Sequence, residues 1–216
     1  MSEKFASYFS KQELDIIGGL DTPEKIQKFI DSEIKYDPMR EDRSVKEVLS
    51  DKLAECYNGA LFATACLLNQ GVDASVVELL ARDDEEHVLC VYKKDGKYGS
   101  IAQSKYLYLR SRNPMYETVR DLVVSYMEFY FSFNGHFSLS SFTNPLNLTK
   151  YKLKWLYDGK TVIKMARDLR RSKHFVLVKP NDPYYYVTPE KYWHETLFVP
   201  EGTKIPPKYL EKKLKK

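Results

Sequence analysis

The sequence predicts an α+β fold in which a buried helix packs on an antiparallel sheet. Residues 56–69 are apolar on almost every side, which is typical of a central helix and not of an amphipathic surface helix. Two runs rich in Val and Leu, 74–80 and 87–93, follow it with the composition of strands. Asp95-Gly96 then joins the second run to 98–104 through a dipeptide favoured in two-residue hairpins, so these strands are antiparallel.

Helical signals fill the chain before this central helix. Residues 2–21 predict a short helical lead-in. Thr22 can cap a second helix whose first position, Pro23, has the fixed φ that a first turn requires. Ser44 and Glu47 have the spacing of a capping box, so we expect a short helix that leads to the central one.

The second half of the chain predicts a more mixed structure. Residues 105–115 form a basic, irregular connection, and 116–131 have the apolar spacing of a long amphipathic helix. Residues 151–157 alternate like a strand, 161–172 predict a basic helix, and 175–178 predict a short strand.

We interpret the chain as a core with an extension packed on it. The sequence changes character near residue 132, where a stretch rich in Ser, Asn and Phe begins and periodicity is lost. We therefore assign 1–131, with its helical lead-in, to the α+β core. Residues 132–216 form a C-terminal α/β extension, and the boundary is soft over 132–148.

Composition narrows the function classes. The 216 residues are 43% hydrophobic and 30% charged, which is typical of a globular domain. The formal net charge of +4 is mild and basic residues are interleaved with acids, so we expect no nucleic-acid partner. No apolar run has membrane-spanning length and no signal segment follows the first residues, so we expect a cytoplasmic protein without a membrane partner. The sequence leaves the oligomeric state open.

The cysteines and histidines predict neither a disulfide framework nor a metal site. The three cysteines are an odd number without a C-x-x-C pair, and the four histidines lack metal-binding spacing. We therefore expect no metal and no organic cofactor. Cys66, inside the central helix, and Cys90, on the strand that follows, are interpreted as core residues.

Cys56 and His87 are the candidate catalytic residues. Cys56 stands at the start of the central helix, where free backbone N–H groups and the helix dipole lower the pKa of a thiol. His87 opens the second strand, and a nearby imidazole would lower that pKa further. The acidic run 83–86 is expected to raise the pKa of His87 and to favour imidazolium. Cys90, three residues from His87, should face the opposite side of the strand.

Three segments, taken in order, resemble the transglutaminase-like superfamily, which has the papain-like cysteine-protease fold. They are the cysteine segment 55–61, the histidine strand 86–92 and the hairpin 95–102. More loosely, the likeness extends over 110–130 toward an uncharacterised bacterial subgroup of this superfamily.

The resemblance implies acyl transfer or amide hydrolysis on a protein or peptide substrate. Cys56 would carry the thioester, and His87 would form the thiolate and later protonate the leaving amine. The backbone N–H of Tyr57 would help to stabilise the oxyanion. We expect the Cys56 sulfur within about 4 Å of a His87 ring nitrogen.

One departure from the family pattern bears on activity. The aspartate that orients the histidine falls on Ala102, and no carboxylate follows before Glu117. Ser104 lies on the same strand face as Ala102 and is the local candidate for the orienter, although Gln103, a backbone carbonyl or a distant acid remain alternatives. A hydroxyl accepts a hydrogen bond from imidazole but does not stabilise imidazolium as a buried carboxylate does.

Two other functions therefore stay open beside catalysis on a protein or peptide substrate. The first is a catalytically inactive binding or scaffold module that keeps the fold and has lost the triad. The second is a small-molecule acyltransferase, for which the sequence offers no recognisable acyl-carrier pocket.

Overall fold

A six-stranded antiparallel sheet forms the centre of the computed structural model, which describes residues 3–130, 132 and 137–179. The strand order is β6-β5-β4-β3-β7-β8, and every neighbouring pair is antiparallel. The strands are β3 (Ala74–Ala81), β4 (His87–Lys94), β5 (Lys97–Ile101), β6 (Arg112–Tyr116), β7 (Leu139–Thr143) and β8 (His174–Val176). A separate parallel pair, β1 (Lys35–Tyr36) and β2 (Leu53–Ala54), brings the chain to the central helix.

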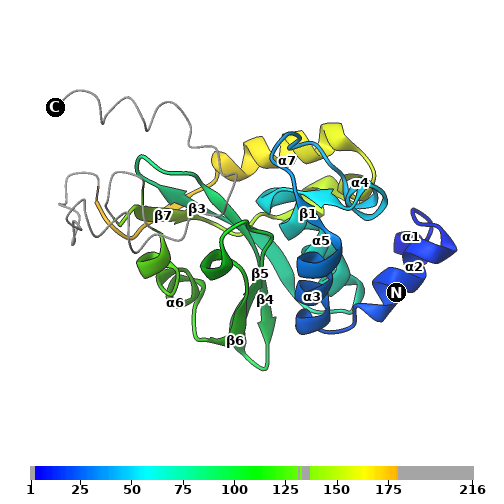
Figure 1. The fold of residues 1–216 in the computed structure, drawn as a ribbon, viewed down its shortest axis with the longest axis horizontal. Coiled ribbons are helices and arrows are strands. Elements are labelled where there is room, and N and C mark those ends of the chain that lie inside the picture. Colours follow the sequence, from blue (N-terminus) through cyan, green and yellow to red (C-terminus); the bar gives the residue numbers. More distant parts are fainter. Residues whose placement is uncertain (1–2, 131, 133–136, 180–216) are drawn as a thin grey trace.

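Helices cover both faces of this sheet. Figure 1 shows α3, α4, α5 and α7 on one side and α6 on the other. The α-helices are α1 (Glu3–Ala6), α2 (Lys11–Gly19), α3 (Pro23–Glu33), α4 (Val45–Asp51), α5 (Cys56–Asn69), α6 (Val119–Val124) and α7 (Gly159–Arg170). Short 3-10 turns are η1 (Leu107–Leu109), η2 (Met127–Phe129), η3 (Leu148–Tyr151) and η4 (Lys154–Leu156). The mixed α+β class with an antiparallel sheet is confirmed.

The core has two parts, one on each face of the sheet. The larger part holds α5 together with buried residues of α3, α4 and α7, and we call it the α5 side. The smaller part lies under α6 and we call it the α6 side. Helix α5 is buried on nearly every side, as its composition predicts. A Cβ on Gly59 would lie 2.5 Å from the Cβ of Gln103, so a glycine there lets α5 approach the chain that leaves β5.

Local signals in the sequence place several elements correctly. Thr22 caps α3 with Pro23 at its start, and Ser44 forms a capping box with Glu47 at the start of α4. The turn at Asp95-Gly96 has left-handed φ values of 51° and 80°, which a two-residue hairpin of this kind requires. These features depend on neighbouring residues, so a single sequence suffices to predict them.

Three predicted elements are wrong in type or extent. The long helix expected over 116–131 is the end of β6, the short α6 and η2, because Tyr116 pairs with Tyr98 in the sheet. The strand expected over 151–157 is two 3-10 turns, in which the adjacent Trp155 and Leu156 are both buried. A strand would send adjacent side chains to opposite faces.

The irregular connection expected over 105–115 contains β6, an edge strand. Pro114 is tolerated there because an edge strand leaves backbone N–H groups outside the ladder.

The C-terminal part that the structure describes joins the same sheet. β7 pairs with β3, β8 pairs with β7, and α7 contributes Val162 and Met165 to the α5 side of the core. The division of the chain near residue 132 stays a prediction, and residues 180–216 of the expected extension lie outside the described residues.

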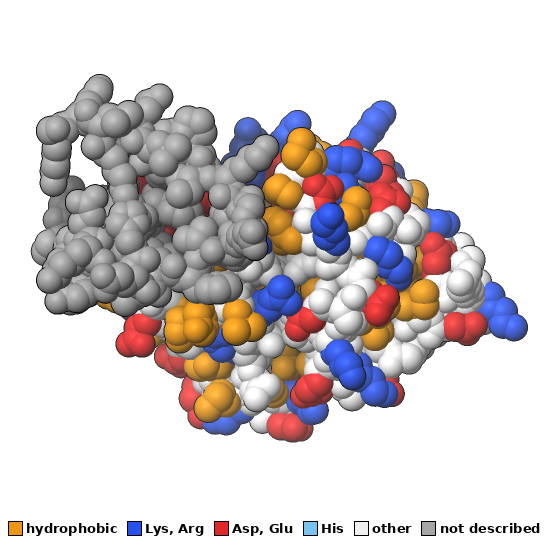
Figure 2. All heavy atoms as spheres, in the orientation of Figure 1, with side chains coloured by type: hydrophobic (Ala, Val, Ile, Leu, Met, Phe, Trp, Pro, Cys, Tyr) orange, Lys and Arg blue, Asp and Glu red, His pale blue; other side chains and the backbone are white. Residues whose placement is uncertain are grey.

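Charged side chains of both signs are mixed on the described part of the face in Figure 2. Lys and Arg are interspersed with Asp and Glu there, and they do not form a continuous basic stripe on it. Within the described residues, none of the helices combines the length and the apolar character needed to cross a membrane.

Candidate functional site

A pocket of about 250 Å³ lies at the start of α5. Its wall is formed by β1 and the loop that follows it, the start of α5, strands β3 and β4 with the loop between them, and the last turns of α7. Cys56 lines this pocket, as do Glu55 before it and Tyr57 after it. The predicted cysteine therefore lies in the wall of a cavity, at the first position of a buried helix.

Glu55 controls the surroundings of the Cys56 sulfur. The sulfur lies 3.0 Å from Oε2 of Glu55. The same carboxylate caps α5, because it accepts hydrogen bonds from the backbone N–H groups of Tyr57 at 2.9 Å and Asn58 at 3.0 Å. The Tyr57 N–H that was predicted to stabilise an oxyanion is thus already occupied by a carboxylate.

The Cys56 thiol does not have the lowered pKa that the helix start predicts. Burial raises its pKa well above the ordinary value, and the adjacent Glu55 carboxylate raises it further. Burial also raises the pKa of Cys66, and that of Cys90 to about 12. Cys66 and Cys90 are core residues, as predicted.

His87 faces the α6 side of the sheet. Val88 and Cys90 belong to the α5 side of the core, whereas Leu89 and Val91 belong to the α6 side. Because side chains alternate along a strand, His87 shares the face of Leu89 and Val91. The opposite placement of Cys90 and His87 is therefore as predicted.

The predicted contact between Cys56 and His87 is not formed, which corrects the expected catalytic pair. The Nε2 atom of His87 lies 2.7 Å from the carbonyl oxygen of Leu109 and donates to it, while the sulfur contacts Glu55. The physical reason is the alternation of β4, which turns Val88 and not His87 toward the start of α5. Val88, unlike His87, lines the Cys56 pocket.

The environment of His87 favours neutral imidazole. The side chain is buried, and burial lowers its pKa to about 4 even though the Leu109 carbonyl acts in the opposite direction. The acidic run 83–86 was expected to raise this pKa, so that expectation is wrong in direction.

The expected orienter, Ser104, is not hydrogen-bonded to His87. Its hydroxyl accepts a hydrogen bond from the backbone N–H of Tyr106 at 3.0 Å. The backbone carbonyl of Leu109 holds the ring instead. A backbone carbonyl is among the alternatives that the sequence leaves open, but no signal in the sequence indicates which carbonyl it is.

Ala102, where the resemblance would place an aspartate, is held by a glutamine from α3. Its backbone N–H donates to Oε1 of Gln27 at 3.1 Å, and its carbonyl accepts from Nε2 of the same side chain at 3.0 Å. This two-sided hydrogen bond joins α3 to the end of β5, so the position serves packing in this structure.

Carboxyl groups that sequence reasoning passed over surround the pocket. Glu41, Glu78, Glu85 and Glu86 line it together with Arg170 of α7. Glu85 and Glu86 belong to the acidic run 83–86, for which the sequence predicts only an effect on the pKa of His87. Glu78 carried a usable signal, since a carboxylate inside a Val- and Leu-rich strand is rare unless it is paired.

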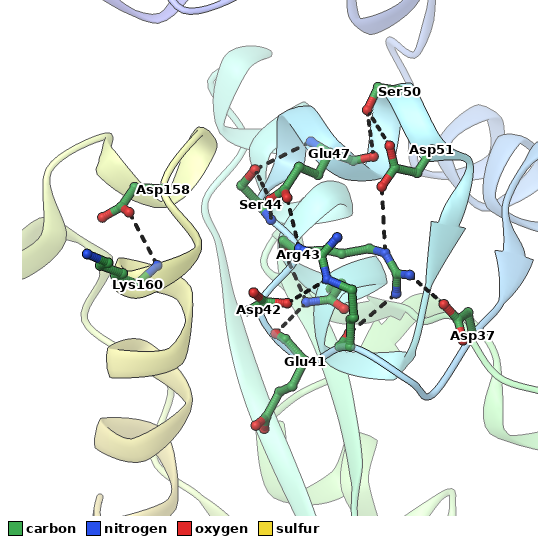
Figure 3. Close-up of polar contacts among 12 residues, drawn as sticks. Asp37, Glu41, Asp42, Arg43, Ser44, Glu47, Ser50, Asp51, Asp158 and Lys160 are labelled. Carbon is green, nitrogen blue, oxygen red and sulfur yellow. Dashed lines mark hydrogen bonds and ion pairs between the residues drawn. The ribbon is translucent and has the colours of Figure 1, made fainter.

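A buried arginine holds the loop that supplies Glu41. Figure 3 shows Arg43 between Asp37 and Asp51, and the Arg43 side chain is 4% exposed. The side chain of Asn58 in α5 donates to the backbone carbonyls of Glu41 at 2.9 Å and Arg43 at 3.1 Å. These bonds fix the loop against the first turn of α5 and so shape the pocket.

The described residues do not include any cluster of three or more His, Cys, Asp or Glu side chains arranged to hold a metal ion. Comparison with known proteins adds no relative: no family model and no curated protein matches the chain. The resemblance to transglutaminase-like proteins rests on the segments 55–61, 86–92 and 95–102.

Proposed function

We propose that the chain is a ligand-binding module with a transglutaminase-like arrangement of helix and sheet, and that it does not carry out acyl transfer through Cys56 and His87. The observation that carries this proposal is the placement of the two side chains on opposite faces of the sheet. Without imidazole beside it, the Cys56 thiol keeps its proton at neutral pH.

The first turn of α5 supports the same proposal. An oxyanion hole needs free backbone N–H groups aimed at the position of the developing charge. At Tyr57 the N–H is bonded to the Glu55 carboxylate, and a negative carboxylate at that place repels an oxyanion. The pocket is thus suited to hold a ligand and poorly suited to stabilise a tetrahedral intermediate.

Cysteine-dependent acyl transfer or amide hydrolysis is the second candidate. The place of Cys56, at the first position of a buried helix and in the wall of a pocket, favours it. Glu55 would then accept the thiol proton, the sulfur would attack the amide carbonyl carbon, and the proton would pass to the leaving amine as the thioester forms. Water would release the acyl group. Burial raises the pKa of the Glu55 carboxyl group, but the same group raises the pKa of the Cys56 thiol, so the thiolate is disfavoured and this route would be slow.

Turnover and acylation distinguish the two candidates. The protein is incubated with a glutamine-donor peptide and a dansylated amine, and separately with p-nitrophenyl acetate, followed by mass spectrometry with peptide mapping. We expect product only at the rate of the buffer control and no acyl group on Cys56. Turnover that is lost in Cys56→Ser, together with an acyl group on Cys56, would establish the second candidate.

A pair of histidine variants provides the matched control. His87→Gln removes the buried ring, and His174→Gln removes an exposed one from β8. We expect the two variants to give the same background rate as the natural protein. A rate above background that only His87→Gln abolishes would show that His87 reaches the reacting groups.

A further inference from the structure

We propose that the pocket at the start of α5 binds a small organic cation that carries a guanidinium group. This inference rests on the binding function proposed above and names the class of ligand. The pocket has a volume of about 250 Å³. Sites for drug-sized ligands usually have volumes of about 300 Å³ or more, so the ligand is small.

Charge selects a cation. Among the residues that the structure describes, five glutamates line the pocket together with one basic residue, Arg170. Lys105 lies outside the lining but is 3.4 Å from Glu85, so two basic residues face five carboxyl groups. The five are Glu41, Glu55, Glu78, Glu85 and Glu86. Opposite charges a few ångströms apart attract more strongly in a partly buried site than in water, so a cation is favoured there.

Glu78 indicates where the cation binds. Its side chain is 4% exposed and lines the pocket from β3. Its Oε2 atom is buried and has no hydrogen-bond partner among the described residues. A buried carboxylate oxygen without a partner is costly, so a donor that enters the pocket would stabilise it.

The chain itself shows that these carboxylates accept a guanidinium group. Arg170 forms an ion pair with Glu41, and its Nε atom lies 3.7 Å from Oε1 of Glu78. The Arg170 side chain is 53% exposed, so it reaches the site from the solvent side. A planar guanidinium offers parallel donors that match carboxylates. The Tyr36 side chain lines the same wall, and the Lys105 ammonium lies over its ring at 5.9 Å from the centroid.

Calorimetric titration of the full chain tests the ligand class. The probes are n-butylguanidinium, the uncharged n-butylurea and Ca²⁺, at about pH 8, where Glu78 with its pKa of about 7 is ionised. We expect n-butylguanidinium to bind and n-butylurea to bind at least about tenfold more weakly, because it lacks the charge. Equal affinity for the two, or displacement of the guanidinium by Ca²⁺ at lower concentration, would overturn the inference.

Three variants locate the site. Glu78→Gln should weaken n-butylguanidinium about tenfold, since it removes the charged acceptor. Glu117→Gln removes the same charge from an exposed position on the chain after β6 and should leave the affinity unchanged. Arg170→Gln should tighten binding, because it removes the competing cation. Unchanged affinity in Glu78→Gln or weaker binding in Arg170→Gln would contradict the assignment.

The result separates this inference from the proposal on which it rests. A protein that binds none of the probes and shows no turnover overturns the guanidinium ligand and leaves the module proposal intact. Turnover that depends on Cys56 overturns the module proposal, whichever probe binds.

Discussion

Replacing Arg43 by methionine is expected to lower the free energy of unfolding by about 3 kcal/mol, the low end of the range for breaking a buried ion pair. The Arg43 side chain is 4% exposed, pairs with Asp37 and lies 3.9 Å from Asp51 (Figure 3). Methionine retains much of the volume but removes the counter-charge from Asp37, which is 18% exposed. Because the Asp37 carboxylate keeps some contact with water, we expect the loss of free energy of unfolding to lie at the low end of the range for buried ion pairs.

Arg40→Met is the matched control for this prediction. Arg40 pairs with Asp42 and Glu47, both at 2.9 Å, but its side chain is 42% exposed. Exposed pairs contribute less than about 1 kcal/mol, so urea unfolding of this variant should stay close to that of the natural protein. Equal losses in the two variants would show that Arg43 does not hold the loop as described.

Glu78→Gln and His87→Gln are expected to change the pH dependence of stability in opposite directions. Burial raises the pKa of Glu78 from 4.5 to about 7 and lowers that of His87 from 6.5 to about 4. Each shift corresponds to about 3 kcal/mol of stability. The contribution of Glu78 to the free energy of unfolding is most favourable below pH 4.5, where the carboxyl group is protonated in the folded and the unfolded state. That stability is lost as pH rises to about 7. The contribution of His87 to the free energy of unfolding is most favourable above pH 6.5, and that stability is lost as pH falls to about 4.

The variants separate these two contributions. Relative to the natural protein, Glu78→Gln should gain up to about 3 kcal/mol between about pH 4.5 and pH 7. His87→Gln should gain by a similar amount as pH falls from about 6.5 to 4. The measurement is urea unfolding at several pH values, with His174→Gln as a control for an exposed ring. If the free energy of unfolding of a variant differs from that of the natural protein by an amount that does not vary with pH, the group that this variant removes is not buried as described.

The start of the central helix and the hairpin could be predicted because their signals are local. The apolar run after Cys56 and the Asp95-Gly96 pair each determine one element without reference to the rest of the chain. The face of His87 could not be predicted in the same way. Both faces of β4 are apolar, with Val88 and Cys90 on one and Leu89 and Val91 on the other, so alternation alone does not say which face meets α5.

The chemistry around Cys56 was harder to predict for another reason. Glutamate is not among the residues that favour a helix N-cap, so nothing in the sequence indicated that Glu55 would cap α5 and contact the sulfur. The pocket also draws residues from distant parts of the chain, such as Glu41, Glu78 and Arg170. Only the folded arrangement brings these charges together, so spacing in the sequence does not reveal them.

The pH dependence of Cys56 alkylation shows whether an imidazole activates this thiol. Native protein is treated with iodoacetamide between about pH 6 and pH 9, and the rate constant at Cys56 is obtained by peptide mapping. We expect a rate constant that rises throughout this range without a plateau and is the same in His87→Gln, because the thiol keeps its proton and the His87 imidazole is bonded to Leu109 instead. A plateau that begins below about pH 7 and disappears in His87→Gln would contradict the account, since it would reveal a thiolate stabilised by His87.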